Sequence, residues 1–370
     1  MSGAVEPVAL IHDYLLFLRG GERTFDAMAQ IWPRAPIYAA AYSERDTEGR
    51  FAGRDVRTSW LQRLRVDRRT YRALLPLYPR AIESLPVAGH GLIVSSSFGF
   101  AHGVRPGDGA VHVCYCHSPF RYVWHERERA IASPPRPLRP LAARTLDSVR
   151  RWDVRASERV THYIANSRIT QRRIADYYGR EAEVIHPPVD VDRFEPGDEV
   201  GDHFLFVGEL LAHKRPEVAL EAARLAGRRM VVVGGGPELR RLRSRYGDSA
   251  EFLGRISDAE LARVYPRALA LVIPNVEEFG ITAVEAQAAG RPVLARAVDG
   301  ATECVRDGRT GVLVEGSDPR AFATAMREVD FRAFSPEAAR ANAEAFAVER
   351  FREAMREAVA RARAAGPRGS

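Results

Sequence analysis

Short apolar runs alternate along the chain with helix-forming stretches, and this pattern predicts an α/β fold with parallel sheets. Each run is about five residues long, which is the length of a buried strand, and is flanked on both sides by turn residues. The expected strands cover residues 8–12, 91–97, 110–116, 161–165, 204–208, 230–233, 251–256, 268–273 and 310–314. Strands that alternate with helices are typical of parallel sheets whose faces are both covered.

The expected helices end at capping residues, glycines and prolines. Asn166 and Ser167 are expected to cap a helix, which explains both without a catalytic role, and Gly290 with Pro292 stops another. The expected helices cover about 23–31 and 144–159, a stretch that ends at 177, one that ends near 226, the stretch 281–289, and a last one from about 348.

Two domains fit a chain of 370 residues, because each domain can then bury a core of its own. Pro187 and Pro188 stiffen a segment between the two strand-rich halves and mark the link. The expected division is residues 1–188, residues 189–345, and a C-terminal segment 346–370 whose helix crosses back onto the first domain.

The loop between the strand 268–273 and the helix 281–289 is the strongest candidate for a site. Open α/β sheets bind ligands at the carboxyl ends of their strands, and a helix N-terminus attracts phosphate. Glu277 lies in this loop and Glu285 lies about one turn inside the helix, so both carboxylates can accept hydrogen bonds from sugar hydroxyls. A solvated pair of glutamates at a helix start is the structural alternative.

Composition singles out one further residue. Of the 55 lysine and arginine residues, only Lys214 is a lysine. A compact ammonium does not replace a guanidinium fork, so a retained lysine suggests a site. Lys214 follows the strand 204–208 and precedes a helix, where an ammonium can neutralise a phosphate.

Weaker signals lie in the first half of the chain. The paired glycines Gly20 and Gly21 follow the first strand, where they serve either phosphate approach or an ordinary turn. His117 follows the strand 110–116, a position that suits either a site or a structural histidine.

The segment Trp60–Arg80 interleaves arginines with apolar and aromatic residues. From Arg54 through Arg80, both included, the chain has eight arginines and two acidic residues, Asp55 and Asp67. Such a surface is typical of proteins that lie on anionic membranes. Nucleic acid is disfavoured because no binding motif accompanies the charge. A solvated arginine face over core side chains is an equal alternative.

Composition also limits the class of protein. Hydrophobic residues make up 46% of the chain, no apolar run reaches the length of a membrane span, and the first residues lack a secretory signal. The three cysteines include Cys114 and Cys116, which have no companions for a zinc site, so buried thiols in a reducing compartment are expected. The prediction is a cytoplasmic protein.

The site loop carries a family resemblance. Glu277-x-Phe279-Gly280, then Glu285-Ala and an A-x-G-x-P-V stretch, resembles the E-x7-E signature of family 4 glycosyltransferases. That resemblance implies the GT-B fold, with two Rossmann-like domains whose parallel sheets face each other across a cleft. It also implies sugar transfer from a nucleotide donor with retained anomeric configuration, without metal or other cofactor. Asp190 and Asp192 match the family's interdomain linker and are not expected to bind metal.

Donor-binding roles follow from the resemblance. Glu285 is expected to bind the ribose and Glu277 the donor sugar, while Lys214 and the helix start grip the diphosphate. The other expected donor-binding residues are Gly20, Gly21, Arg215, Arg255, Ile256, Phe279, Gly280 and Ile281. Glu209 stands where the family has an arginine, which puts part of the diphosphate grip in doubt, and Arg215 is a candidate to compensate.

The segment around His117 refines the expected substrate. Y-x-H-x-P-x-R-Y-x-W resembles a family branch that contains O-antigen and polysaccharide mannosyltransferases. It implies a catalytic role for His117 with Glu277 and Lys214, and acceptor binding by Arg121. Residues 1–188 would then bind the acceptor and residues 189–345 the nucleotide-sugar.

The sequence thus predicts a hexosyltransferase that moves mannose from GDP-mannose to a glycan or lipid-linked acceptor, in cell-surface polysaccharide or glycolipid synthesis. Contact with the inner face of the membrane through Trp60–Arg80 is part of this hypothesis, and nucleic acid is not. The alternatives are a UDP-sugar or other nucleotide-sugar donor, another GT-B activity such as an epimerase or phosphorylase, and a non-catalytic Rossmann module that binds membrane or nucleic acid.

Overall fold

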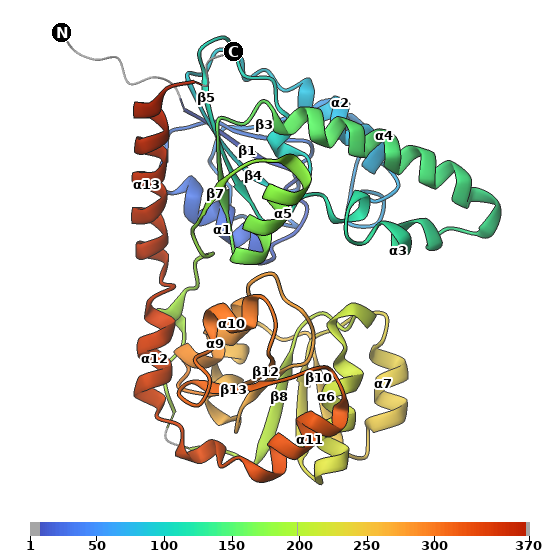
Figure 1. The fold of residues 1–370 in the computed structure, drawn as a ribbon, viewed down its shortest axis with the longest axis vertical. Coiled ribbons are helices and arrows are strands. Elements are labelled where there is room, and N and C mark those ends of the chain that lie inside the picture. Colours follow the sequence, from blue (N-terminus) through green and yellow to red (C-terminus); the bar gives the residue numbers. More distant parts are fainter. Residues whose placement is uncertain (1–7, 198, 368–370) are drawn as a thin grey trace. The chain divides into compact units, whose positions relative to one another are not determined.

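The computed structural model describes residues 8–197 and 199–367. They form two compact units, shown in Figure 1. The N-terminal unit runs to His186 and also takes in the chain from Arg352 onward, while the C-terminal unit is Pro187–Phe351.

A parallel sheet of seven strands organises the N-terminal unit, in the order β3-β2-β1-β4-β5-β6-β7. The central strands β1, β4 and β5 are almost wholly buried, as expected for a sheet with both faces covered. The strands are β1 (Val8–His12), β2 (Ile37–Ala39), β3 (Val56–Thr58), β4 (Leu92–Ser97), β5 (Val111–Cys116), β6 (His162–Ala165) and β7 (Ala182–Val184). The α-helices are α1 (Gly20–Ala29), α2 (Tyr78–Glu83), α3 (Arg127–Ala132), α4 (Arg139–Ser157) and α5 (Arg168–Tyr178).

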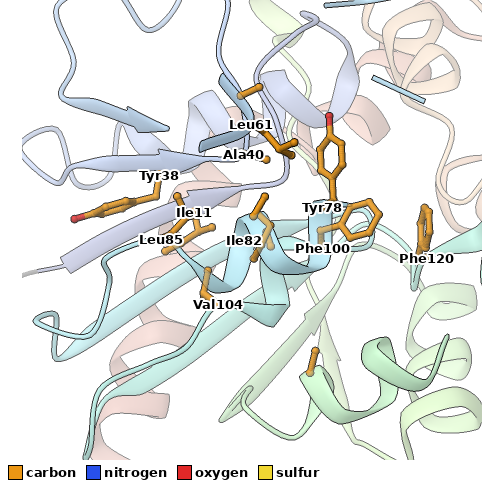
Figure 2. Packing of buried hydrophobic residues seen from close by; sticks show 14 of the residues in the cluster. Ile11, Tyr38, Ala40, Leu61, Tyr78, Ile82, Leu85, Phe100, Val104 and Phe120 are labelled. Atoms are coloured by element: carbon orange, nitrogen blue, oxygen red, sulfur yellow. The ribbon is translucent and has the colours of Figure 1, made fainter. Parts of the chain in front are cut away.

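The core beside this sheet absorbs much of the arginine-rich segment. Leu61, Tyr71 and Tyr78 belong to the same buried cluster as Ile11 and Phe100. In Figure 2 the rings of Tyr78 and Phe100 lie side by side, with centroids 5.1 Å apart. Part of the apolar content of the segment 60–80 is therefore core, and only the rest remains available to a partner.

The C-terminal unit contains a parallel sheet of six strands in the order β10-β9-β8-β11-β12-β13. Its strands are β8 (His203–Val207), β9 (Arg229–Val233), β10 (Ala250–Gly254), β11 (Leu271–Ile273), β12 (Val293–Arg296) and β13 (Gly311–Val314). The α-helices are α6 (Pro216–Ala226), α7 (Leu239–Tyr246), α8 (Asp258–Val264), α9 (Ile281–Ala288), α10 (Gly300–Cys304), α11 (Pro319–Glu328) and α12 (Pro336–Glu344). Two buried clusters form its core.

The last helix, α13 (Val348–Ala365), carries the chain from the C-terminal unit to the N-terminal unit. Arg361 donates to Glu183 at 2.8 Å, and Arg352 contacts Gln30, so the helix is attached to the N-terminal unit from Arg352 onward. Across the described residues, no helix is both long and apolar enough to cross a membrane.

The predicted α/β fold with parallel sheets is confirmed, but some elements escaped prediction. The strands β2, β3 and β7, with three residues each, and β12, with four, are too short to show periodicity. Helix α1 begins at Gly20 rather than near Arg23, because the Glu22 carboxylate accepts the Arg19 N–H at 2.9 Å and closes the first turn. Cys114, Cys116 and Cys304 are buried free thiols.

Candidate functional site

The loop between β11 and α9 is shaped by two glycines. Gly280 precedes the helix with φ +105°, a backbone conformation that favours glycine. Gly300, at the start of α10, lies so close that a Cβ there would be 2.4 Å from the Cα and carbonyl oxygen of Phe279. The Gly300 N–H also donates to the Glu277 carbonyl at 3.1 Å. The helix α9 thus starts from a tightly held loop, and the Ala283 N–H in its first turn donates to the Gly280 carbonyl at 2.9 Å. The helix N-terminus, with its partial positive charge, is a place where an anion can bind.

Lys214 and Glu277 meet directly. The Lys214 Nζ lies 2.8 Å from Oε1 and 2.7 Å from Oε2 of Glu277. Asn275 adds a third contact, because its Nδ2 donates to Oε1 at 2.8 Å. Both charged side chains keep partial exposure, 28% for Lys214 and 19% for Glu277. Two residues predicted independently for the site therefore form one ion pair.

Strand order explains why these two residues meet. β8 and β11 are neighbours in the parallel sheet, so the loops that follow them leave the same edge. Lys214 ends a short 3₁₀ turn after β8, and Arg215 then adopts a left-handed conformation with φ +52° before α6 begins. A non-glycine residue held at positive φ indicates a loop that its surroundings constrain.

A glycine loop closes the same edge of the sheet. A Cβ on Gly234 would lie 1.9 Å from the Gly208 carbonyl oxygen, and one on Gly236 would lie 2.5 Å from that of Leu210. A Cβ on Gly235 would touch the Arg255 side chain at 3.2 Å. The absence of side chains at Gly234 and Gly236 lets the loop after β9 approach the loop after β8 closely. Gly235 of the same loop lies beside the Arg255 side chain, which follows β10. Ile256 packs against one of the two buried clusters of the C-terminal unit, the one that contains Phe279.

Glu285 is held by two partners that the sequence did not predict. Its Oε1 accepts from Arg193 Nη2 at 2.9 Å, and its Oε2 accepts from the Tyr265 hydroxyl at 2.8 Å. A carboxylate offers about four acceptor sites, so these bonds leave capacity for a ligand hydroxyl. Burial raises the pKa of Tyr265 well above its ordinary value, so this hydroxyl remains a donor.

In the N-terminal unit, His117 belongs to a buried relay of three side chains. The Ser96 hydroxyl lies 2.9 Å from His117 Nε2 and 3.1 Å from His12 Nδ1. The Phe98 ring stacks on His117 with centroids 4.4 Å apart, and a Cβ on Gly21 would lie 2.0 Å from the Phe98 ring. Phe98 therefore connects His117 to the predicted glycines at the start of α1.

The relay favours one tautomer of His117. Among the described residues, His12 Nε2 is buried without a hydrogen-bond partner. A buried N–H without an acceptor is rarer than an unused acceptor, so we assign the His12 proton to Nδ1. Ser96 then accepts from His12 and donates to His117 Nε2, which leaves the His117 proton on Nδ1. Burial is the main cause that lowers the pKa of His12 well below its ordinary value, and the nearby His117 lowers this pKa further, so His12 is neutral.

Ser96→Ala should remove the preference of His117 for the tautomer that is protonated on Nδ1. Because His117 Nε2 loses its donor, we expect a mixture of tautomers in ¹⁵N NMR spectra of histidine-labelled protein. The lost buried hydrogen bonds should lower the free energy of unfolding by about 1–3 kcal/mol. The matched control is Ser95→Ala, since the Ser95 hydroxyl bonds His112 Nε2 at 2.8 Å instead. Unchanged His117 signals in Ser96→Ala would contradict the relay.

Two buried carboxyl groups support the same region. Asp13 accepts from the backbone N–H groups of Phe98 and Phe100 at 2.7 and 3.0 Å and so shapes the loop after β4. Burial raises the pKa of Asp13 to about 6 even against these donors. It raises the pKa of Glu22 to about 7 although the Arg19 N–H opposes the shift. Both groups position backbone, and neither follows from a sequence pattern.

Arg121, the predicted acceptor-binding residue, lies at the surface of the N-terminal unit. It lies in a 3₁₀ turn after β5, half-exposed, with Nη1 3.8 Å from Glu126 and its guanidinium over the Tyr122 ring. Gly20, Gly21, His117 and Arg121 belong to the N-terminal unit, whereas the other predicted site residues belong to the C-terminal unit.

In each unit, side chains that hold the predicted residues were not singled out in the sequence. Arg193, Tyr265 and Asn275 each bond a predicted glutamate, and His12 and Ser96 hold His117. The position of His12 at the carboxyl end of the first strand was the one usable clue. Within residues 8–197 and 199–367, no cluster of three or more His, Cys, Asp or Glu residues is arranged to hold a metal ion.

Two family descriptions match successive parts of the chain. Residues 19–193 match the family described as Glycosyltransferase Family 4. Residues 192–344 match the family described as Glycosyl transferases group 1. The boundary between the two matches lies just past the start of the C-terminal unit at Pro187.

Curated relatives share sequence over half of the chain. The chain is 38% identical over 222 residues to a D-inositol 3-phosphate glycosyltransferase of Geodermatophilus obscurus, covering 50% of this chain and 49% of the relative. A protein of the same name from Streptomyces scabiei is 36% identical over 232 residues, covering 52% and 51%. The chain thus spans about half the length of the curated relatives it matches.

Solved structures resemble the whole chain. HepE of Anabaena in complex with UDP and glucose superimposes with a TM-score of 0.69 at 17% identity, covering 96% of this chain and 99% of HepE. Sucrose-phosphate synthase of Thermosynechococcus elongatus gives a TM-score of 0.72 at 18% identity, covering 97% and 100%. At these identities the likeness concerns the fold, which is GT-B.

Proposed function

Because the chain belongs to the group 1/family 4 glycosyltransferases of the GT-B fold, we propose that it transfers a hexosyl group from a nucleoside diphosphate sugar to an acceptor hydroxyl. The observation that carries the proposal is the Lys214–Glu277 ion pair beside the N-terminus of α9. This pair brings a cation and a carboxylate together at one edge of the C-terminal sheet, an arrangement that supports binding of a diphosphate and of sugar hydroxyls.

In the proposed reaction the bond between the anomeric carbon and the diphosphate breaks as a bond to the acceptor oxygen forms. Lys214 and the first turn of α9 stabilise the charge that develops on the diphosphate. Glu277 binds donor-sugar hydroxyls, Glu285 binds the ribose, and Arg255 with Ile256 lies beside the base. The acceptor proton passes to an oxygen of the leaving phosphate, on the same face, so the anomeric configuration is retained and no residue becomes covalently attached.

A UDP-sugar is the donor we favour. The similar HepE structures contain UDP, UDP with glucose, and UDP-glucose. GDP-mannose, which the segment around His117 led us to expect, is the second candidate; the curated relatives named above are not called mannosyltransferases. Their names make D-inositol 3-phosphate the first acceptor to test, with glycan or lipid-linked acceptors next.

The N-terminal unit would bind the acceptor, with His117 at the transferred sugar and Arg121 at the acceptor. The segment Trp60–Arg80 supports contact with an anionic membrane, because Trp60 and Leu64 remain 39% and 51% exposed among its arginines. A non-catalytic module remains the rival, and it would bind membranes without responding to sugar nucleotides.

Thermal stabilisation by UDP, GDP and their sugars tests the proposal. A ligand present at a hundred times its Kd stabilises the folded state by about 2.7 kcal/mol, which corresponds to a rise in Tm of about 5–10 °C. A rise with UDP and UDP-sugars alone supports the favoured donor. A rise with GDP and GDP-mannose alone transfers the proposal to mannose, and no rise with any nucleotide contradicts the transferase.

A further inference from the structure

A helical hairpin projects from the N-terminal unit. The helices α3 and α4, joined by a 3₁₀ turn at Arg136–Leu138, extend beyond the strands of their sheet in Figure 1. We call residues 133–141, where the hairpin reverses, the hairpin tip. Its sequence, Ser-Pro-Pro-Arg-Pro-Leu-Arg-Pro-Leu, holds four prolines.

Hydrogen bonds and an ion pair hold the hairpin tip in place. Arg139 donates from Nη2 to the Ala132 carbonyl at 3.1 Å and from Nε to the Pro134 carbonyl at 3.3 Å. Below the tip, Arg127 and Asp147 join α3 to α4 at 2.6 Å. Because prolines also restrict the backbone, the tip presents its side chains in a fixed arrangement and loses little entropy when it binds.

The tip exposes large apolar side chains. Leu138 is 52% exposed and Leu141 is 64% exposed, the highest fraction among the large hydrophobic residues of the described chain. Leu138 is the N-cap of α4 and Leu141 lies three positions later in its first turn, a spacing at which side chains are neighbours on a helix surface. Pro137 and Pro140 beside them are also exposed. Water thus contacts an apolar apex.

Positive charge surrounds this apex. From Arg129 through Leu146 the chain has four arginines and no aspartate or glutamate. Arg129, Arg136 and Arg144 are exposed, whereas Arg139 is partly buried. An apolar apex with an arginine rim matches a surface that has anionic groups outside and hydrocarbon beneath.

We propose that the hairpin tip inserts into the interfacial layer of an anionic lipid bilayer. A second copy of the chain is a poor occupant, because two acid-free arginine rims repel each other. Nucleic acid is also a poor occupant, since the tip has no aromatic side chain for base stacking and would leave its leucines in water. The inference adds a specific inserting element to the membrane contact in the proposed function and rests on that part of it.

The hairpin is joined to the other basic surface of its unit. Leu75 and Leu77, within the arginine-rich segment 60–80, pack against the cluster that contains Val149 and is flanked by Leu146 of α4. Both surfaces therefore share one support. The tip supplies insertion, and the segment 60–80 adds electrostatic attraction, worth more at low salt.

Vesicle co-sedimentation tests the proposal with the full chain. We expect binding to vesicles that contain phosphatidylglycerol and weak binding to pure phosphatidylcholine. Immersing a leucine is worth about a tenfold change in partition or more, so Leu138→Ser with Leu141→Ser should weaken binding by about a hundredfold. The matched control is Leu225→Ser with Leu253→Ser, which alters two leucines of the C-terminal unit that are 39% and 37% exposed.

The outcomes separate the competing explanations. Binding that the double tip variant keeps would overturn the proposal and leave the segment 60–80 as the membrane contact. Self-association, or DNA binding, that the tip variant abolishes while vesicle binding persists would assign the tip to that partner instead. A nucleotide-induced rise in Tm, measured on the same preparations, reports on the transferase site independently, so failure of one proposal does not imply failure of the other.

Discussion

Glu277→Ala is expected to lower kcat/KM by about a thousandfold, because it removes a donor-sugar contact and releases the Lys214 ammonium from its position; loss of one preorganised charge-stabilising group typically slows catalysis by about 10²–10³. Folding should persist. Both partners of the pair are partly exposed, so the uncompensated ammonium can be hydrated and the Tm should change by no more than about 4 °C.

Lys214→Ala completes a double-mutant cycle with this variant. If the pair works as a unit, the double variant should be about as slow as either single variant. Glu277→Gln is the conservative control, because an amide can still hydrogen-bond sugar hydroxyls but does not neutralise Lys214. Wild-type turnover of Glu277→Ala would remove Glu277 from the site, and additive losses would mean that the two residues act separately.

Gly300→Ala should damage the site from a distance. The new Cβ would lie 2.4 Å from backbone atoms of Phe279, and backbone cannot rotate away as a flexible side chain can. We expect the loop 274–280 to shift and the bond from Gly300 N–H to the Glu277 carbonyl to break. Overpacking of this kind costs about 3 kcal/mol, which corresponds to a fall in Tm of about 6–12 °C. Nucleotide-induced stabilisation should also decrease.

Gly208→Ala provides the comparison for this prediction. Gly208 follows β8 at the same edge of the sheet. A Cβ at this position would contact only the Phe206 ring, at 3.7 Å, an ordinary van der Waals distance. Its Tm should stay within about 3 °C of wild type. Equal Tm values for Gly300→Ala and the wild-type protein would show that α10 does not hold the site loop as tightly as the close approach implies.

The local signals were readable because they depend on neighbours in sequence. The apolar run before Pro274, the glycine before Ile281 and the stop at Gly290 placed the strand, loop and helix of the site to within a few residues. The solitary Lys214 stood out by composition alone. The short strands β2, β3 and β7 escaped because three residues carry no usable period.

The hydrogen-bond partners of the predicted site residues could not be identified from local sequence patterns. Arg193 bonds Glu285 across 92 positions of sequence, and Ser96 bonds His117 across 21. Nothing in the local composition of either segment indicates the other. Which arginine, among so many, reaches a glutamate is decided by how helices pack on a sheet.

Local sequence was thus enough to predict the α/β fold, the loop that starts at Pro274 and the importance of the single lysine. The ion pair between Lys214 and Glu277 follows from the strand order of the folded sheet, because the contact requires β8 and β11 to be neighbours although β9 and β10 lie between them in sequence. The close approach of Gly300 to Phe279 also depends on tertiary packing, because it requires the loops that follow the neighbouring strands β11 and β12 to meet. Periodicity records which face of an element is buried; it does not record which element lies against that face.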